Sequence, residues 1–366
     1  MAAMPASQFV IRPAGESDGP GIVALRRKIE ELPVPEKNDL AFWRWENIEN
    51  PYGRAIAMIA SLGEEVVSCF ALYPRQVRIT GRPYSCCLSA ESMTDRRFRS
   101  KGLFPRLWYE IEPAAKALKI DLLYGFPNRN SRPVFQQGFK WLDVANPTLW
   151  VYPLRPQKIF SLRRSRILSS LALPLAAGGL FYRIPFGFKY SNRVFETTCF
   201  DQRFAPLVEE IHNRSPIVLE RSLDYLNWRY IRTVGRNYTL LYSAAENNAG
   251  IAGYLVYRLA SHESQELGVI MDFQFSGNAP RQSAAELLST ALRRMDNEGA
   301  CAALCLSMPG DPKARFLGRQ GFIPLPRKIN PHPFDLMIKF CSKDLSEQFL
   351  VNPAHWRLDF GDIDVF

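Results

Sequence analysis

The chain has 366 residues, 47% hydrophobic and 22% charged, which excludes a disordered chain and predicts a folded protein with more than one core. The formal net charge of +10 favours anionic partners, but there is neither zinc-finger spacing nor a basic region followed by heptads, so nucleic acid is not an expected partner. Seven scattered cysteines without a CxxC pair, and an N-terminus without a basic and apolar leader, predict a cytoplasmic protein with no metal site.

Hydrophobic periodicity in the first 60 residues predicts a short strand and an amphipathic helix. The strand is expected at 9–12, and the helix begins near Asp18. The expected apolar face of this helix consists of Ile22, Leu25, Ile29 and Leu32.

The region from 55 to 137 predicts strands followed by a strand–helix–strand unit. A hairpin is expected at 55–62 and 65–73 with Gly63 at its turn, continuing through 76–80 to a second turn at Gly81. The remaining elements are a strand at 84–94, a helix at 103–118, a buried strand at 120–126 and a short helix at 132–137. This order indicates an α/β fold of the α+β kind, with a mixed sheet.

Three short motifs recur at a nearly constant separation. Trp43-Arg44-Trp45 is echoed by Trp228-Arg229-Tyr230, Gly53-Arg54 by Gly235-Arg236, and Gln137-Gly138-Phe139 by Gln320-Gly321-Phe322. Repeats at one offset and in one order indicate two copies of one fold. We therefore predict domains at 1–153 and 190–345, a segment at 154–189 between them, and a C-terminal extension at 346–366.

A basic loop lies between the expected strand at 84–94 and the helix at 103–118. It contains Arg96, Arg97, Arg99 and Lys101, and Gly102 stands where the helix begins. Free N–H groups at a helix N-terminus bind anions, and a glycine lets those groups converge without a Cβ in the way. The alternative, a solvated basic loop, is open on these residues alone.

The segment Arg99-Ser-Lys-Gly102-Leu-Phe104 resembles the Q/R-x-x-G-x-G/A pyrophosphate loop of the GNAT superfamily of N-acetyltransferases. Ile11-Arg12-Pro13-Ala14, Phe98, and the segment with Pro127-Asn128, Ser131 and Gly138-Phe139 also resemble that family. Phe104 departs from the pattern, which has Gly or Ala there. The resemblance implies two tandem GNAT-like domains, as in mycothiol synthase and N-myristoyltransferase.

By this resemblance, the donor is acetyl-CoA or a longer acyl-CoA, and the acceptor is an amine. The fourth strand would line the pantetheine arm, the basic loop the pyrophosphate, and the segment after the fifth strand would complete the site. The implied cofactor-binding residues are Ser92, Met93, Thr94, Arg97, Arg99, Ser100, Lys101, Gly102, Leu103, Phe104, Asn128, Asn130 and Ser131.

Glu91 is the candidate general base, because it is the single carboxylate on its expected strand and apolar or small residues flank it. The alternative is an edge carboxylate that faces water. The family's usual tyrosine acid is missing before Gly138-Phe139, so Tyr124 or a water would replace it. Cys86 and Cys87 are expected to be small buried hydrophobes rather than acyl-carrying nucleophiles.

The second copy is predicted to be degenerate at the cofactor loop. Its expected counterpart of Arg99-x-x-Gly102 is Gln282-Ser-Ala-Ala285, where the glycine is lost and Glu286 brings a negative charge. We therefore expect phosphate binding in the first copy and a structural or acceptor-site role for the second.

The segment between the copies has basic ends at 163–166 and 183–189 and an uncharged middle at 167–182. The middle is shorter than the ~20 residues of a spanning helix and is interrupted by Pro174 and Gly178. Two interpretations stay open. The segment contacts a membrane surface, which would place the protein peripherally at the inner face of the membrane, or it is a hydrophobic linker packed between domains.

The leading functional hypothesis is an N-acyltransferase, with an amino sugar or a lipid-linked surface-polysaccharide precursor as an acceptor suited to that segment. One alternative is a non-catalytic acyl-CoA or acyl-carrier binding protein, which the missing tyrosine favours. Another is a peptidoglycan-type aminoacyl transferase, which the Gly102 loop disfavours.

Overall fold

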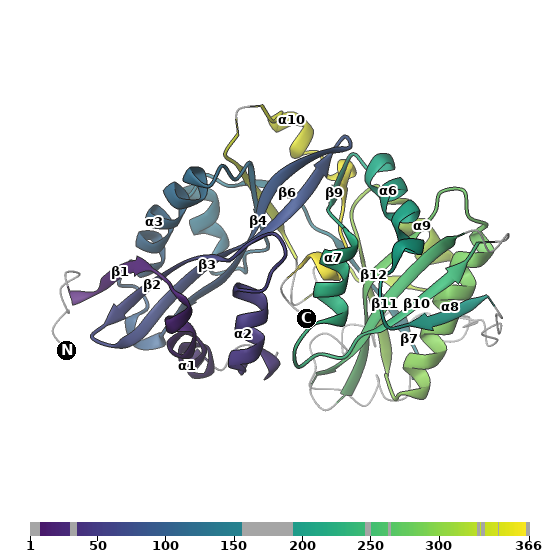
Figure 1. Cartoon of the computed structure of the whole chain (residues 1–366), viewed down its shortest axis with the longest axis horizontal. Helices are drawn as coiled ribbons and strands as arrows, with labels where there is room; N and C mark the ends of the chain where they lie inside the picture. Colours follow the sequence, from purple (N-terminus) through teal and green to yellow (C-terminus); the bar gives the residue numbers. More distant parts are fainter. Residues whose placement is uncertain are drawn as a thin grey trace.

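The computed structural model describes residues 8–29, 35–155, 193–245, 250–262, 265–327, 330, 334–342 and 344–363. The chain forms two lobes, each built on one mixed sheet, and α2 (Leu40–Asn47) and α7 (Leu223–Leu226) lie where the lobes meet (Figure 1). The other elements of the N-terminal half are β1 (Val10–Pro13), α1 (Gly19–Ile29), β2 (Ile56–Leu62), β3 (Glu65–Ile79), β4 (Arg82–Thr94), α3 (Leu103–Ala117), β5 (Leu122–Gly125), β6 (Leu142–Ala145) and β7 (Thr148–Pro153). Those of the C-terminal half are β8 (Val194–Thr197), α6 (Ala205–Arg214), β9 (Ile217–Leu219), β10 (Thr239–Ala244), β11 (Ile251–His262), β12 (Gln265–Phe275), α8 (Arg281–Asn297), β13 (Ala302–Ser307), α9 (Pro312–Arg319), β14 (Ile323–Pro324), β15 (Leu336–Phe340), α10 (Glu347–Leu350) and β16 (Trp356–Arg357).

The predicted elements of the first copy are confirmed, with three differences in detail. β3 is one 15-residue strand rather than two pieces, because residues 74–75 continue to pair with β4. The strand expected at 120–126 is shorter, and the short helix expected at 132–137 contains a π-helical turn at Val134–Gly138. Leu32 lies outside the described residues, whereas Ile22, Leu25 and Ile29 are buried on α1 as expected.

The two sheets exchange strands between the halves of the chain, and β9 and β16 also join the first sheet, β9 pairing with β3 and β16 with β9. The first has the order β1-β2-β3-β4-β5-β15-β6, and the second, read from its other edge, has the order β8-β10-β11-β12-β13-β7-β14. β15 from the C-terminal half thus lies between β5 and β6, and β7 from the N-terminal half lies between β13 and β14. The predicted ranges 1–153 and 190–345 follow the sequence repeat, whereas each folded sheet also includes strands from the other half: β9, β15 and β16 in the first sheet and β7 in the second.

Local details of the two halves also correspond, at an offset of 183 positions between Trp45 and Trp228. Asp39 caps α2 and Ser222 caps α7, each through its side chain. The β2–β3 ladder shifts register after Ala60, and the β10–β11 ladder shifts after Ser243. The structural counterpart of Trp228 is therefore Trp45, not Trp43 as the motif comparison suggested.

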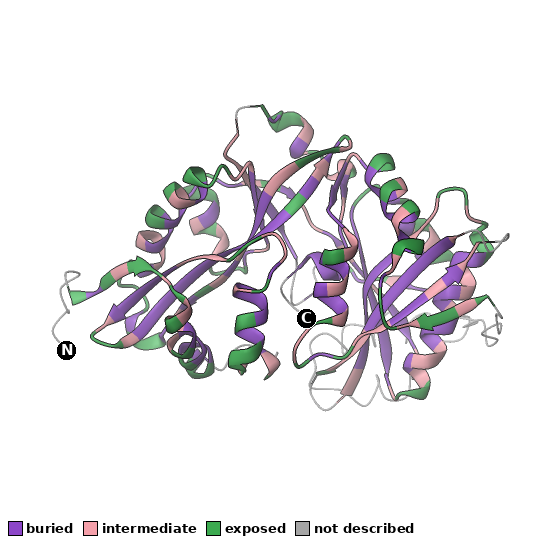
Figure 2. Cartoon of the chain, viewed as in Figure 1, coloured by how far each residue is buried: buried purple, intermediate pink, exposed green. Residues whose placement is uncertain are grey.

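Helices cover both faces of the first sheet and bury their apolar faces against it (Figure 2). On one face, α3 packs Leu107, Trp108 and Ile111 against β2 and β3. On the other, α1 packs Ile22 and Leu25 against Ile59 and Cys69. Burying such side chains stabilises the fold by roughly 1.5–3 kcal/mol each, which fixes the helices that carry the site.

Candidate active site

The candidate site lies where β4 and β5 part. The two strands pair in parallel from Cys86–Leu122 to Ser89–Gly125, after which β4 continues to Thr94 while the chain after β5 turns away. A cavity of about 270 Å³ opens beside this split. It is lined by Arg26, Lys37, Leu88, Ser89, Ala90, Glu91, Ser92, Met93, Phe126, Pro127, Asn128, Ser131, Phe135 and Ile363.

A bulge on β4 turns Glu91 into the protein. The β3–β4 ladder pairs Ala71 with Ala90 and Cys69 with Met93, so β4 carries one extra residue at this point. Glu91 has a φ of 53°, a left-handed backbone conformation that a non-glycine residue adopts at a cost of about 1–3 kcal/mol. As a result, the Glu91 side chain is buried, although Ser92 beside it is exposed.

Glu91 belongs to a buried polar network rather than to an apolar pocket. Its Oε1 atom forms an ion pair with Arg26 and accepts a hydrogen bond from the hydroxyl of Tyr73 at 2.8 Å. The Oε2 atom is buried and has no hydrogen-bond partner in the described structure. The interpretation of Glu91 as flanked by apolar residues was therefore incomplete, because Arg26 and Tyr73 come from α1 and β3 and are distant in sequence.

Ion pairs between Arg97 and two carboxylates hold the loop after β4 in place. The carboxylate of Asp95 accepts the N–H of Arg97 at 2.9 Å and pairs with its guanidinium at 2.8 Å, and Glu65 pairs with the same guanidinium at 2.5 Å. The hydrogen bond from Arg97 holds the pKa of Asp95 below its usual range. Arg97, predicted to bind the cofactor, thus already has two carboxylate partners that shape the loop.

The first turn of α3 has backbone N–H groups, those of Leu103 and Phe104, that precede the intrahelical hydrogen bonds. Gly102 caps the helix with φ of 69°, and a Cβ at this position would meet no atom within 4 Å, so the glycine is needed for its backbone conformation rather than for space. The N–H groups of the first turn precede the first helical bond, from Arg106 N to Gly102 O at 3.3 Å. Arg99, Ser100 and Lys101 are exposed beside this turn.

Phe104 leaves the anion site open, although the family pattern has a small residue there. Its ring packs against Phe70, Phe135 and Phe139 at centroid distances of 5.4, 5.8 and 5.4 Å. The side chain therefore joins the core under α3 rather than covering the loop.

The segment after β5 forms a compact turn. Asn128 Oδ1 accepts the N–H groups of Asn130 at 2.9 Å and Ser131 at 3.0 Å. Asn128 and Ser131 line the cavity, whereas Asn130 does not. Of the predicted cofactor residues, Ser92, Met93, Asn128 and Ser131 thus share one cavity, and Thr94 holds its hydroxyl 2.8 Å from Ser68 Oγ.

Comparison with known proteins places this arrangement in a family. Residues 10–141 match the family model described as the acetyltransferase (GNAT) domain. They are a GNAT domain. The N-terminal part of the chain therefore carries an acyltransferase domain.

Solved structures resemble the whole chain. N-myristoyltransferase from Saccharomyces cerevisiae with bound myristoyl-CoA is similar over 100% of this chain and 86% of its own, with TM-score 0.63 and 11% identity. A GCN5-related N-acetyltransferase from Anabaena variabilis is similar over 91% and 73%, with TM-score 0.60 and 12% identity. A putative acetyltransferase from Pyrococcus horikoshii is similar over 100% and 98%, with TM-score 0.57 and 12% identity. These likenesses establish the fold, and no curated protein matches in sequence.

The placement of Tyr124 in the GNAT domain argues against its predicted role as the acid. Its ring is fully buried, its hydroxyl donates to Asp362 O at 3.2 Å, and it is not part of the cavity wall. Burial raises its pKa well above the ordinary value, so it holds its proton tightly. Cys86 and Cys87 are fully buried as expected, and burial raises the pKa of Cys87 to about 12.

The cofactor loop of the second copy differs more than its sequence indicated. The cap of α8 is Pro280, so Gln282 and Ala285 lie inside the helix and the expected correspondence with Arg99 and Gly102 is wrong. The loop before the helix donates the Gly277 N–H to Glu210 Oε1 at 2.6 Å. The carboxylate of Glu210 thus occupies a backbone N–H group that would otherwise be available to bind a phosphate of the cofactor.

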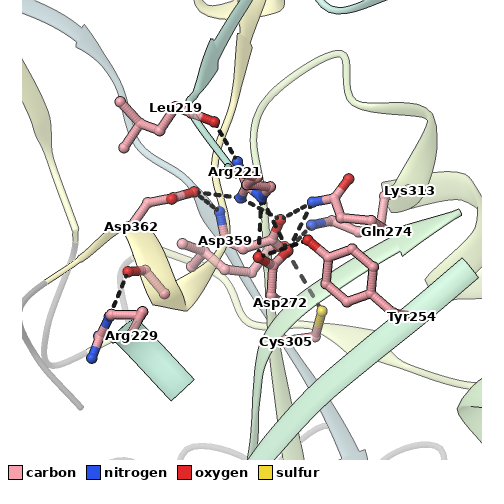
Figure 3. Close-up of polar contacts among 12 residues, drawn as sticks. Leu219, Arg221, Arg229, Tyr254, Asp272, Gln274, Cys305, Lys313, Asp359 and Asp362 are labelled. Carbon is pink, nitrogen blue, oxygen red and sulfur yellow. Dashed lines mark hydrogen bonds and ion pairs between the residues drawn. The ribbon is translucent and has the colours of Figure 1, made fainter. Parts of the chain in front are cut away.

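A charge cluster occupies the corresponding bulge of the second sheet. The β11–β12 ladder shifts register beside Asp272, and Asp272 pairs with Arg221 at 3.0 Å. Arg221 also pairs with Asp362 at 2.9 Å, and Lys313 pairs with Asp359 (Figure 3). Both C-terminal aspartates therefore anchor the extension in the second lobe, which brings Ile363 to the cavity of the GNAT domain.

Proposed function

We propose that the protein transfers an acyl group from acyl-CoA to an amine in the cavity beside β4 of the GNAT domain. The observation that carries this proposal is Glu91, whose buried Oε2 is without a hydrogen-bond partner in the described structure and which lines the cavity next to the split of β4 and β5. The pyrophosphate would bind the first turn of α3 with Arg99, Ser100, Lys101, Gly102, Leu103 and Phe104.

The chemistry follows from these positions. The amine nitrogen attacks the thioester carbonyl, the C–N bond forms, and the C–S bond breaks as coenzyme A leaves as thiolate. Glu91 takes the proton that the ammonium must lose. Beyond Ser89, β4 has no β5 partner, so its N–H groups on this edge can polarise the thioester carbonyl. After the attack the nitrogen loses a second proton, which water carries to the departing thiolate, since Tyr124 is out of reach.

The donor is proposed to be acetyl-CoA or a longer acyl-CoA, and the acceptor an amino sugar or a lipid-linked polysaccharide precursor. Contact with the inner face of the membrane belongs to the same proposal, but the segment 163–189 lies outside the described residues. No helix in the described part of the chain is long and apolar enough to cross a membrane.

A non-catalytic acyl-CoA binding protein is the second candidate. The burial of Tyr124 favours it, because that tyrosine was the candidate proton donor for the leaving thiolate. Release of free thiol from acetyl-CoA in the presence of an amine panel separates the two candidates, since a binding protein would release none.

Titration calorimetry of the full chain with acetyl-CoA, palmitoyl-CoA and desulfo-CoA tests the donor site. Gly102→Val should lower CoA affinity at least about tenfold, because a β-branched residue resists the left-handed conformation that aims the N–H groups. Gly63→Val is the matched control, since Gly63 has φ of 58° and equally open surroundings in the β2–β3 turn. Ala285→Val tests the second copy and should leave affinity intact. Equal losses in all three variants would refute the site.

A further inference from the structure

Tyr73 lies between two buried carboxylates. Its hydroxyl is 2.8 Å from Glu91 Oε1 and 2.9 Å from Glu46 Oε2. The side chains of Glu46 and Glu91 are 6% and 3% exposed, and Tyr73 is fully buried. The three groups come from α2, β4 and β3, so the fold alone brings them together.

The charges around this triad are cationic. Arg26 of α1 pairs with Glu91 and lies 3.9 Å from Glu46, and Lys37 lines the same cavity from the 3-10 turn at Pro35–Asn38. Arg75 of β3 and Arg229 beside α7 are buried, and the charge of Glu46 acts on both. The two carboxylates of the triad are therefore surrounded by buried positive charges.

One hydroxyl proton cannot be donated fully to two carboxylates at once. While Glu46 and Glu91 are both ionised, the proton of Tyr73 is shared between them. When Glu91 gains a proton, Glu46 becomes the stronger acceptor, because hydrogen bonds to ionised acceptors are stronger than those to neutral ones. The hydroxyl then turns fully toward Glu46.

We infer that Tyr73 and Glu46 are positioning residues that set how readily Glu91 takes the proton of the acceptor amine. The inference rests on the proposed function, in which Glu91 is the base. In the step, one N–H bond of the ammonium breaks and one O–H bond forms at Glu91 Oε2. The O–H bond of Tyr73 stays intact and only changes direction, so the network carries no net proton away.

The two positioning residues have opposite effects on Glu91. Tyr73 donates a hydrogen bond that stabilises the ionised form, so Tyr73→Phe should make Glu91 easier to protonate. Glu46 adds a like charge and competes for the hydroxyl, so Glu46→Gln should make Glu91 harder to protonate. A role in packing alone would not move the titration of Glu91 in opposite directions.

The test is a pH titration of the unliganded full chain by NMR with ¹³Cδ-labelled glutamate, in which Glu91→Gln assigns the Glu91 signal. The Glu91 midpoint should rise by about 0.5–1 pH unit in Tyr73→Phe and fall by about as much in Glu46→Gln. The acid limb of the kcat profile should move the same way.

Tyr52→Phe is the matched control, since it removes a tyrosine hydroxyl outside the triad, 3.1 Å from Ser222 Oγ, and should leave the Glu91 midpoint unchanged. Shifts in the same direction, or no shift in either variant, would overturn the inference. Because the NMR titration requires no turnover, a chain that fails to transfer acyl groups would contradict the proposed function without deciding this inference.

Discussion

Trp45 and Trp228 stack on each other at the junction of the two lobes. Their rings are 4.6 Å apart and 17° from parallel. The indole N–H of Trp45 donates to Trp228 O at 3.2 Å, and that of Trp228 donates to Trp45 O at 3.3 Å. Each tryptophan thus donates its indole N–H to the backbone carbonyl of the other. The two equivalent residues of the repeat therefore form a reciprocal, nearly symmetric contact.

Trp45→Phe and Trp228→Phe should each lower the free energy of unfolding by about 1–3 kcal/mol, because each removes one buried hydrogen bond and part of the stack. The double variant should lose less than the sum, with a coupling of roughly 0.5–1.5 kcal/mol. Urea denaturation of the four proteins measures this. Trp45→Phe combined with Trp108→Phe serves as the control and should be additive, since Trp108 belongs to the separate core under α3.

Glu91→Gln should lower kcat by about 10²–10⁴-fold while CoA affinity stays nearly unchanged. The reason is that the neutral amide of a glutamine cannot accept the amine proton, whereas the pyrophosphate turn is a separate structure at α3. Steady-state kinetics and calorimetry on one preparation check both halves of the statement. A variant that keeps the acid limb of the wild-type pH–rate profile would remove Glu91 from the reaction.

Tyr124→Phe should leave kcat within about twofold of the wild type, since the hydroxyl is turned toward Asp362 O and away from the cavity. The substitution should instead lower the free energy of unfolding by about 0.5–1.5 kcal/mol, because one hydrogen bond is lost. Kinetics and urea denaturation separate these effects. A large fall in kcat at unchanged stability would restore Tyr124 as the proton donor.

His212 should make stability depend on pH in the acid range. Burial, with the positive charges of Arg221 and Arg78, lowers its pKa to about 4. A depressed pKa in the folded state means that the unfolded chain binds the proton more tightly, so this contribution is complete above pH ~6.5 and is lost as pH falls toward 4.

His212→Gln keeps an acceptor for the Arg221 N–H, which His212 Nε2 binds at 3.1 Å, but does not titrate. The stability of the wild type relative to this variant should therefore rise with pH between about 4 and 6.5, by at most about 1.4 kcal/mol per pH unit, and then level off. Urea denaturation at several pH values measures the difference. A difference that is flat across this window would show that His212 protonates alike in both states.

Much of the fold could be predicted from the sequence, because the signals are local. The strand–turn–strand pattern around Gly63 and the basic loop that ends at Gly102 each depend on neighbouring residues. The bulge at Glu91 gave no such signal, since a ladder shift depends on how β3 and β4 pair. The partners of Glu91 were missed for the same reason, as Arg26 and Tyr73 reach it from two other elements and Glu46 is linked to it through Tyr73.

The second copy shows where motif comparison reaches its limit. The spacing between Gln282 and Ala285 imitates the loop motif, but Pro280 starts the helix earlier and places both residues inside it. The exchange of β7 and β15 between the sheets could not be predicted either, because the hydrophobic pattern of a strand does not determine which sheet it joins.

That exchange of strands governs when the protein can fold during synthesis. The first sheet cannot be completed until residues 336–340 have emerged from the ribosome, because β15 fills the place between β5 and β6. Until then, β5 and β6 lack the strand that they share and expose unpaired N–H and C=O groups, which are templates for wrong pairing. Contacts so distant in the chain also form slowly. The cavity is completed later still, because Ile363 forms part of its wall. A ribosome-bound N-terminal half therefore contains most of the site residues, but they are not yet enclosed in a complete cavity.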